Sequence, residues 1–319
     1  MKRVRAAVCR LTINEAVRFA YRGQAKLFRQ WVGYDPDVAL PKRYHEKLFW
    51  RKIFDHNPDF VLFCDKLATK DYVARMAPEV RTPKTLWSGD RIKDAPRELF
   101  SRAVVVKANH GSNYNYFWNG PGDDFGKLSG LATKWMGEDY GARYLEWGYY
   151  GVKKRLFIEE WISSEEPDGF VEMNIRCSDG KAILGSIILR NKTERMQAGY
   201  FETDGTRPAW NDDSISPLRI PRDYTIPACY HRAVELSKKL SVGQDYLRVD
   251  FMGDGKQLYV GEITVYPNAG LSPAKPTGAK CCETIVAENW DLKKSWFLTA
   301  PQRGLKNAYA SWLRNALDA

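Results

Sequence analysis

The sequence contains no apolar run close to the ~20 residues that a membrane-spanning helix needs. Its first residues are basic but hold neither an uninterrupted apolar segment nor a small-residue cleavage site, so a secretory signal peptide is not expected. The six cysteines form no CxxC pair, and the four histidines show neither zinc-ligand spacing nor a local pattern for nucleophilic catalysis. We therefore expect a cytoplasmic protein with reduced thiols.

Internal repeats and low-complexity segments are also lacking, and 44% hydrophobic with 13% aromatic residues is the composition of a folded protein. A chain of 319 residues can bury a large core and form two or three subdomains. Strand patterns cluster in the middle of the chain and helical patterns at both ends. This arrangement predicts an α+β fold.

Helical spacing of apolar residues, caps and prolines predict helices at residues 11–31, 43–56, 65–73, 128–136, 226–240, 282–297 and 304–317. Apolar runs predict strands at residues 85–87, 103–108, 155–162, 170–177, 181–190 and 195–201. Gly23 weakens the middle of the first helix, and Asp179-Gly180 is typical of a hairpin turn. Residues 110–122 are expected to form one long loop, because they are rich in turn-forming residues.

The net charge of +10 is concentrated at one end of the chain. Residues 1–30 hold eight basic residues against Glu15 alone, which leaves a surplus of three for the rest. A basic groove for nucleic acid is therefore not expected. The basic arm is instead expected to meet an anionic polymer or, peripherally, the inner membrane surface. A solvated helix face is the alternative.

The most informative stretch, residues 244–270, predicts two strands joined at a Gly-Asp-Gly break. Each strand carries one carboxylate among apolar residues, Asp250 in the first and Glu262 in the second. Because side chains alternate between faces, an even-numbered loop would put these acids on opposite faces. An odd loop pairs Asp250 with Val260 and makes Glu262 its diagonal neighbour on the same face.

On one face, the two carboxylates can bind a hard cation such as Mg²⁺, which prefers oxygen ligands and keeps waters or phosphate oxygens in its other positions. Arg248, two residues before Asp250, lies on that face too. An Arg–Asp–Glu salt-bridge cluster on a half-solvated sheet is the alternative.

Upstream segments have the character of a phosphate site. Lys107 ends a strand and precedes His110-Gly111-Ser112, a loop whose backbone N–H groups can hold an anion. The pattern is not a G-x-x-x-x-G-K-[ST] loop, and a surface turn is the alternative. Lys66 and Lys70 lie four apart on one helix face, where solvent exposure is the simplest expectation.

Two acids, Glu159 and Glu160, end an apolar strand. Ile158, Trp161 and Ile162 can form an adenine slot while one acid accepts hydrogen bonds from ribose hydroxyls. An edge strand with one exposed charge is the alternative.

The order of these segments resembles that of the ATP-grasp superfamily. They are DKLATK, VVVKANHGS, LFIEEWI, LRVDF and GEITVYPNAG, spread over roughly residues 60–275. The signatures K-x-N-H-G-S, R-V-D and G-E-[IL]-T-x-x-P-x-x-G are similar to those of the TupA-like branch, which is linked to teichuronopeptide and related polysaccharide modification.

The resemblance implies an ATP-grasp fold, in which two α+β subdomains hold ATP between them. We expect a helical region with the basic arm at residues 1–83. A small subdomain with the phosphate loop and hinge strand is expected at 84–160, and a C-terminal subdomain with the metal-site hairpin at 161–319.

The resemblance also implies roles for single residues. Arg248 and Lys107 would be catalytic. Residues that would bind ATP are Lys70, Lys107, His110, Gly111, Ser112, Glu159, Glu160, Trp161 and Ile162. Asp250, Glu262 and Thr264 would hold Mg²⁺. Many members have asparagine where this chain has Thr264, so Asn268 or a water remains an alternative third ligand.

The implied activity is ATP-dependent ligation of a carboxylate to an amine through an acylphosphate. Aromatic residues of the sugar-stacking type occur at Tyr114, Tyr116, Phe117, Trp118, Tyr149 and Tyr150. Together with the resemblance they favour a uronic-acid sugar or anionic polysaccharide as carboxylate and a small amine or amino acid as nucleophile. The alternatives are a kinase of the same fold acting on a hydroxyl, a glycosyltransferase using Asp35 and Asp37, and a non-catalytic basic adaptor for membrane or nucleic acid.

Overall fold

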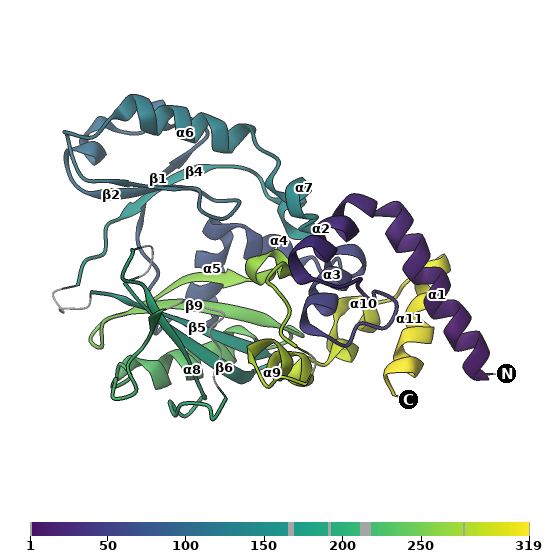
Figure 1. The fold of residues 1–319 in the computed structure, drawn as a ribbon. Helices are drawn as coiled ribbons and strands as arrows, with labels where there is room; N and C mark the ends of the chain where they lie inside the picture. The colour runs from purple at the N-terminus through teal and green to yellow at the C-terminus, as the bar shows by residue number, and fades with distance from the viewer. Residues whose placement is uncertain (1, 165–168, 191–192, 211–217, 277, 319) are drawn as a thin grey trace.

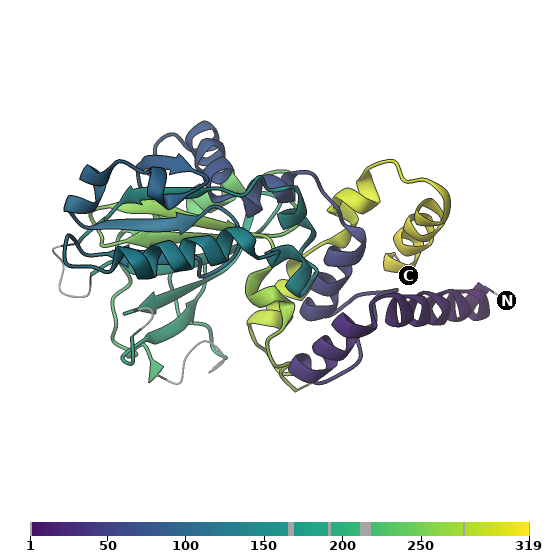
Figure 2. The same cartoon turned by 90° about the horizontal axis from the view of Figure 1, so that it is seen from above.

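The computed structural model describes residues 2–164, 169–190, 193–210, 218–276 and 278–318, with side chains from residue 7 onward. Two mainly antiparallel sheets lie one above the other in Figure 1, and helices from both ends of the chain gather beside them (Figures 1 and 2). The described chain thus combines helices with antiparallel sheets, and the predicted α+β class is confirmed.

The smaller sheet has four described strands in the order β1-β4-β2-β3. They are β1 (Thr85–Gly89), β4 (Leu156–Glu160), β2 (Val104–Ala108) and β3 (Asn115–Trp118). Helix α6 (Phe125–Gly137) covers one face, with Val104, Val106 and Ile158 in the core beneath it (Figure 1). Because side chains alternate along a strand, Lys107 and Glu159 point to the opposite face.

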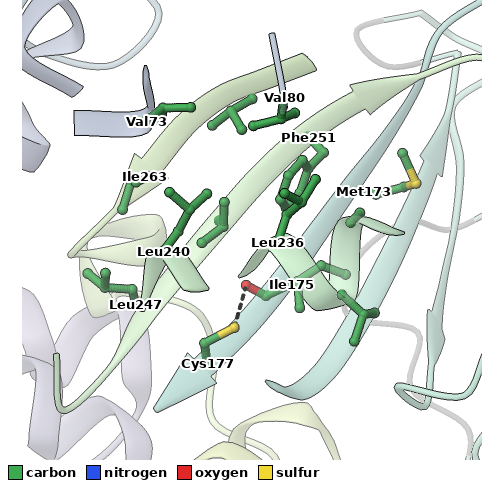
Figure 3. Packing of buried hydrophobic residues seen from close by; sticks show 14 of the residues in the cluster. Val73, Val80, Met173, Ile175, Cys177, Leu236, Leu240, Leu247, Phe251 and Ile263 are labelled. Carbon is green, nitrogen blue, oxygen red and sulfur yellow. Dashed lines mark hydrogen bonds between the residues drawn. The ribbon is translucent and has the colours of Figure 1, made fainter. Parts of the chain in front are cut away.

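The larger sheet has the described order β10-β9-β5-β6-β7-β8. Its strands are β5 (Val171–Ser178), β6 (Lys181–Leu189), β7 (Gln197–Phe201), β8 (Leu218–Arg219), β9 (Leu247–Gly253) and β10 (Leu258–Thr264). One face packs against α8 (Cys229–Leu240) and α5 (Lys66–Met76), and Figure 3 shows Phe251, Met173 and Leu236 in this core. Burying a side chain of this size contributes ~1.5–3 kcal/mol, so the apolar layer fixes which face of β9 and β10 remains polar.

Helices from both chain ends share a second large core. They are α1 (Lys2–Ala20), α2 (Arg22–Val32), α3 (Tyr44–Phe54), α9 (Cys282–Asn289), α10 (Trp296–Thr299) and α11 (Gly304–Leu317). Arg51 of α3 is completely buried, 2.8 Å from Asp245 and 4.3 Å from the ring centroid of Trp290. A buried cation needs such partners, so this contact fixes α3 against the segment that leads into β9.

Four sequence expectations have a direct structural outcome. The helix predicted at 11–31 is two helices, because Tyr21 leaves the helical region (φ −120°, ψ 38°), whereas Gly23 lies inside α2. Asp179 and Gly180 both have positive φ (45° and 76°), as the expected hairpin turn requires. All six cysteines lie within the described residues and are free thiols. The helices of the described chain are too short or too polar to cross a membrane.

Candidate active site

The central hairpin joins β9 and β10 in a register that differs from the predicted one. Leu258 pairs with Gly253, so the connection is even-numbered, and it is not the odd loop that a common face was expected to require. A bulge at Gly261 then shifts the register by one residue, and Glu262 becomes the direct partner of Asp250. Both carboxylates therefore lie on one face by a different route than expected.

The first carboxylate is already engaged. Arg248 Nε and Nη2 each donate a 2.7 Å hydrogen bond to Asp250, and Thr264 Oγ1 donates a third over 3.1 Å. Burial raises the pKa of Asp250, while the Arg248 charge opposes this effect. The Arg248–Asp250 ion pair belongs to the salt-bridge cluster that was the alternative for these residues. It is present although Asp250 and Glu262 lie on the same face of the sheet. The side chain of Glu262 is 35% exposed and remains accessible from the cleft.

Lys66, which was expected to be exposed to solvent, connects the hairpin to the loop above it. Asp65 caps α5 by accepting from Leu67 N over 2.9 Å, which starts the helix at Lys66. Lys66 Nζ donates to Gly111 O over 2.5 Å and lies 3.8 Å from Glu262 Oε1. The expectation that Lys66 is solvated is wrong, since only 17% of its side chain is exposed.

The two predicted phosphate lysines meet at one acid. Lys70 Nζ lies 2.8 Å from Glu159 Oε2, and Lys107 pairs with the other oxygen of Glu159. Burial would raise the pKa of Glu159, but the charges of Lys107 and Lys70 outweigh burial and lower it overall. Two lysine ammonium groups that converge on one carboxylate can also bind a polyanion such as a phosphate chain, whose oxygens would then take the place of the Glu159 carboxylate.

The predicted adenine and ribose residues do not act alike. Glu160 Oε1 accepts from Lys84 N over 2.8 Å, so the two neighbouring acids engage different partners. Glu159 is held by the two lysines, whereas Glu160 uses one oxygen on the backbone N–H just before β1. Trp161 is 38% exposed and contacts Phe117 edge-on, with ring centroids 5.4 Å apart, and Ile162 follows it.

The expected loop at 110–122 is shorter than predicted, because β3 pairs with β2 inside it. Gly111 has φ 77°, and a Cβ there would lie 2.7 Å from the Tyr114 ring, so glycine is required. His110 is buried and its Nε2 lies 3.0 Å from Trp135 O, which anchors the loop to α6. Ser112 is exposed at the tip and lines the cleft.

A cleft of ≈ 990 Å³ lies between this loop, the hairpin and α2. Its lining includes the hairpin residues Arg248, Glu262 and Thr264 and the loop residue Ser112. Further aromatic and charged residues of the lining include Trp31, Tyr114, Lys134, Tyr140, Arg143, Tyr144, Glu146 and Tyr149. Helix α7 (Tyr140–Tyr144) supplies three of these. The cleft therefore joins Arg248, one of the two predicted catalytic residues, to a second, aromatic region.

The donor set of the hairpin fits a magnesium ion bound together with phosphates. Asp250 and Glu262 offer carboxylate oxygens on one face, with the Thr264 hydroxyl beside them. Within the described ranges, no group of three or more His, Cys, Asp or Glu side chains is placed to hold a metal. Other ligands must therefore complete the shell, which suits Mg²⁺, and Asn268 also lines the cleft.

The acids proposed for a glycosyltransferase are occupied elsewhere. Arg10 binds Asp37, and Arg29 lies 3.5 Å from Asp35. These contacts fasten α1 and α2 to the segment before α3, so the pair is a structural feature and not an open metal site.

The sequence model of a family described as TupA-like ATPgrasp matches residues 46–278. The chain belongs to the TupA-like ATP-grasp family. It therefore has the ATP-grasp fold. The match includes every predicted site residue from Lys70 to Thr264.

Several solved structures are distantly similar to this ATP-grasp chain. A D-alanine–D-alanine ligase from Bacillus anthracis complexed with ATP is 16% identical, with a TM-score of 0.36 over 80% of this chain and 66% of that one. The corresponding ligase from Helicobacter pylori is 16% identical, with a TM-score of 0.38 over 72% and 58%. An N5-carboxyaminoimidazole ribonucleotide synthetase complexed with ADP is 12% identical, with a TM-score of 0.38 over 64% and 45%. The chain thus spans less than two thirds of the length of these proteins. A comparison with curated proteins gives no match.

Proposed function

We propose that this TupA-like ATP-grasp protein is an ATP-dependent ligase that joins a carboxylate to an amine. The observation that carries the proposal is the direct cross-strand pairing of Asp250 with Glu262 on one face of the sheet. Glu262 and Arg248, which holds Asp250, line a cleft that Ser112 and Tyr114 of the loop above also line. Carboxylates are poor electrophiles until one oxygen becomes a leaving group. Phosphoryl transfer from ATP meets this need by forming an acylphosphate, which an amine then attacks to release phosphate.

The chain's own residues have separable tasks in this scheme. Lys70 and Lys107 leave their contacts with Glu159 and offset the negative charge of the phosphates during transfer. Asp250 and Glu262 would hold Mg²⁺, which would neutralise charge on the phosphate oxygens. Arg248 is positioned to stabilise negative charge that develops on the acyl group. The 109–114 loop excludes water, which would otherwise hydrolyse the acylphosphate.

For the substrates, we propose a uronic-acid sugar or its polymer as carboxylate and an amino acid or similar small amine as nucleophile. The support is the chemistry of the cleft, where Trp31, Tyr114 and Tyr144 offer flat apolar surfaces and Arg143 offers a cation for an acidic sugar. Trp118, one of the aromatic residues expected to stack on sugar, is buried in the small-sheet core and bonds Phe100 O, so that expectation is wrong for this residue.

The direct test is ADP release by the purified chain with Mg²⁺ and ATP, over uronic acids crossed with amino acids. We expect ADP formation to require both a carboxylate and an amine, with one amide formed per ADP. A stable phosphorylated sugar made without amine would indicate the kinase instead. Absence of ATP turnover with every pair would contradict the ligase.

We also propose that α1 attaches the protein to an anionic membrane surface. Val8, Leu11 and Phe19 are exposed (58%, 64% and 86%), and their spacing of three and eight residues puts them on one helix face. Arg22 and Lys26 of α2, the next helix along the chain, are exposed basic residues. Apolar side chains beside cations favour a lipid interface over a soluble acidic polymer. Residue 1 and the side chains of residues 2–6 lie outside the described part of this arm.

The prediction is that Leu11→Ser combined with Phe19→Ser lowers binding to anionic vesicles ~10-fold or more, because each lost side chain removes membrane-buried apolar area. Co-sedimentation with anionic and neutral vesicles measures this. Leu305→Ser on α11, where the side chain is 89% exposed, is the matched control. Deleting residues 1–30 is a poorer experiment, because Val17 and Phe28 are part of the buried core. Equal binding by both variants would contradict the proposal.

A further inference from the structure

A buried carboxylate in the cleft has no role in the scheme above. Glu146 is only 3% exposed, yet it lines the cleft together with Glu262. It precedes a short helical turn, Trp147–Gly151, but its side chain does not cap that turn. Within the described residues its carboxylate accepts no hydrogen bond and lies in no ion pair at salt-bridge distance. Burying a carboxylate without a hydrogen-bond or ion-pair partner costs free energy, so a bound ligand is expected to supply that partner.

The surroundings favour a cation as the missing partner. Lys52 is the described cation whose charge acts on Glu146. Its ammonium group donates to Tyr144 O (2.9 Å) and Ala269 O (2.6 Å) and is not within salt-bridge distance of Glu146. Glu262 adds a second negative charge on the cleft side. The other titratable groups that sense Glu146 are neutral residues, namely Cys64, Tyr140, Tyr149 and Tyr266. Tyr140 and Tyr144 provide aromatic faces nearby, which also attract ammonium groups.

We propose that Glu146 binds the ammonium group of the amine nucleophile and accepts the proton that this group must lose. The inference rests on the ligase function proposed above and names the amine side of that same site. The carboxylate takes one N–H proton, and the neutral nitrogen attacks the acylphosphate carbon. The C–N bond forms as the C–O bond to phosphate breaks, phosphate leaves with that electron pair, and the second N–H proton is lost to solvent.

The acid–base properties of the site agree with this role. Burial raises the pKa of Glu146 to about 7, which the Lys52 charge opposes and the Glu262 charge reinforces. A carboxylate with a pKa near the operating pH is a better proton acceptor than an ordinary glutamate. Since the acceptor is the charged form, amide formation should decline as the pH falls through about 7.

The test compares two nucleophiles in Glu146→Gln. An amino acid enters as an ammonium ion and needs the acceptor, whereas hydroxylamine is largely unprotonated at neutral pH and traps acylphosphates as hydroxamates. We expect amide formation with the amino acid to fall by ~100-fold or more, with a higher KM for the amine. Hydroxamate formation should stay close to that of the unchanged protein, which also shows that the variant is folded. Glu288→Gln, an exposed change of the same kind on α9, should affect neither reaction.

Equal losses of product formation with both nucleophiles would overturn the inference, because Glu146 would then be needed for folding or for formation of the acylphosphate. Unchanged rates with both would overturn it as well. If the unchanged protein forms no hydroxamate with any carboxylate, the ligase function itself fails, which is a different result. Thermal unfolding of Glu146→Gln with and without ATP shows whether the variant folds and still binds ATP. A variant that does both but forms little amide is impaired at the amine.

Discussion

Replacing Glu262 with glutamine is expected to lower ATP turnover by ~100-fold or more while leaving the fold intact. The side chain is 35% exposed, and its described contact is a 3.8 Å approach of Lys66, so the folded chain loses little when the charge is removed. The substitution removes one of the two carboxylates that lie side by side on β9 and β10, next to the bulge. ADP release at saturating ATP, measured over a range of Mg²⁺ concentrations, checks the prediction.

Controls for this prediction are available in the same chain. Glu235→Gln makes the same chemical change on the exposed surface of α8, where the side chain is 67% exposed, and should leave turnover unchanged. Asp250→Asn should abolish turnover too, but it also leaves Arg248 without its bidentate partner and costs a few kcal/mol of stability. Turnover by Glu262→Gln at the level of Glu235→Gln would remove the metal assignment.

The hairpin shows how much of this site the sequence could determine. The choice of Asp250 and Glu262 followed from polar residues in apolar strands, which local pattern reveals. Their relative placement depended on the loop and on the bulge at Gly261, which local pattern does not reveal. Loop length and bulge each shift the register by one residue, so the predicted common face results from two deviations that cancel.

Contacts between distant segments were harder to foresee. Lys66 reaches Gly111 and Glu262 because the first turn of α5 lies beside β10 and the loop at Asn109, and nothing in its sequence neighbourhood indicates this. Glu146 follows a short helix, and its burial comes from packing against elements far along the chain, among them α3 and β10. The ordered motifs supplied the family and hence the fold, but the amine side of the cleft has no motif.

The second large effect is expected at Lys107. Lys107→Met removes one of two cations at Glu159 and should reduce ATP turnover by ~100- to 1,000-fold, as loss of a transition-state charge partner does. Glu159 is only 3% exposed, so the variant should also lose about 3 kcal/mol of stability, because a buried carboxylate keeps Lys70 alone. Steady-state ADP release and thermal unfolding measure the two effects.

A double variant separates catalysis from stability. Lys107→Met with Glu159→Gln removes the uncompensated charge, so most of the lost stability should return while turnover stays low. The lysines lower the pKa of Glu159, so their stabilising effect is present above the ordinary glutamate pKa and disappears as the pH falls through the lowered value. The deficit of Lys107→Met should therefore shrink in acid, where Glu159 becomes neutral. Recovery of turnover in the double variant would show that Lys107 acts only by neutralising Glu159, and not on the phosphates.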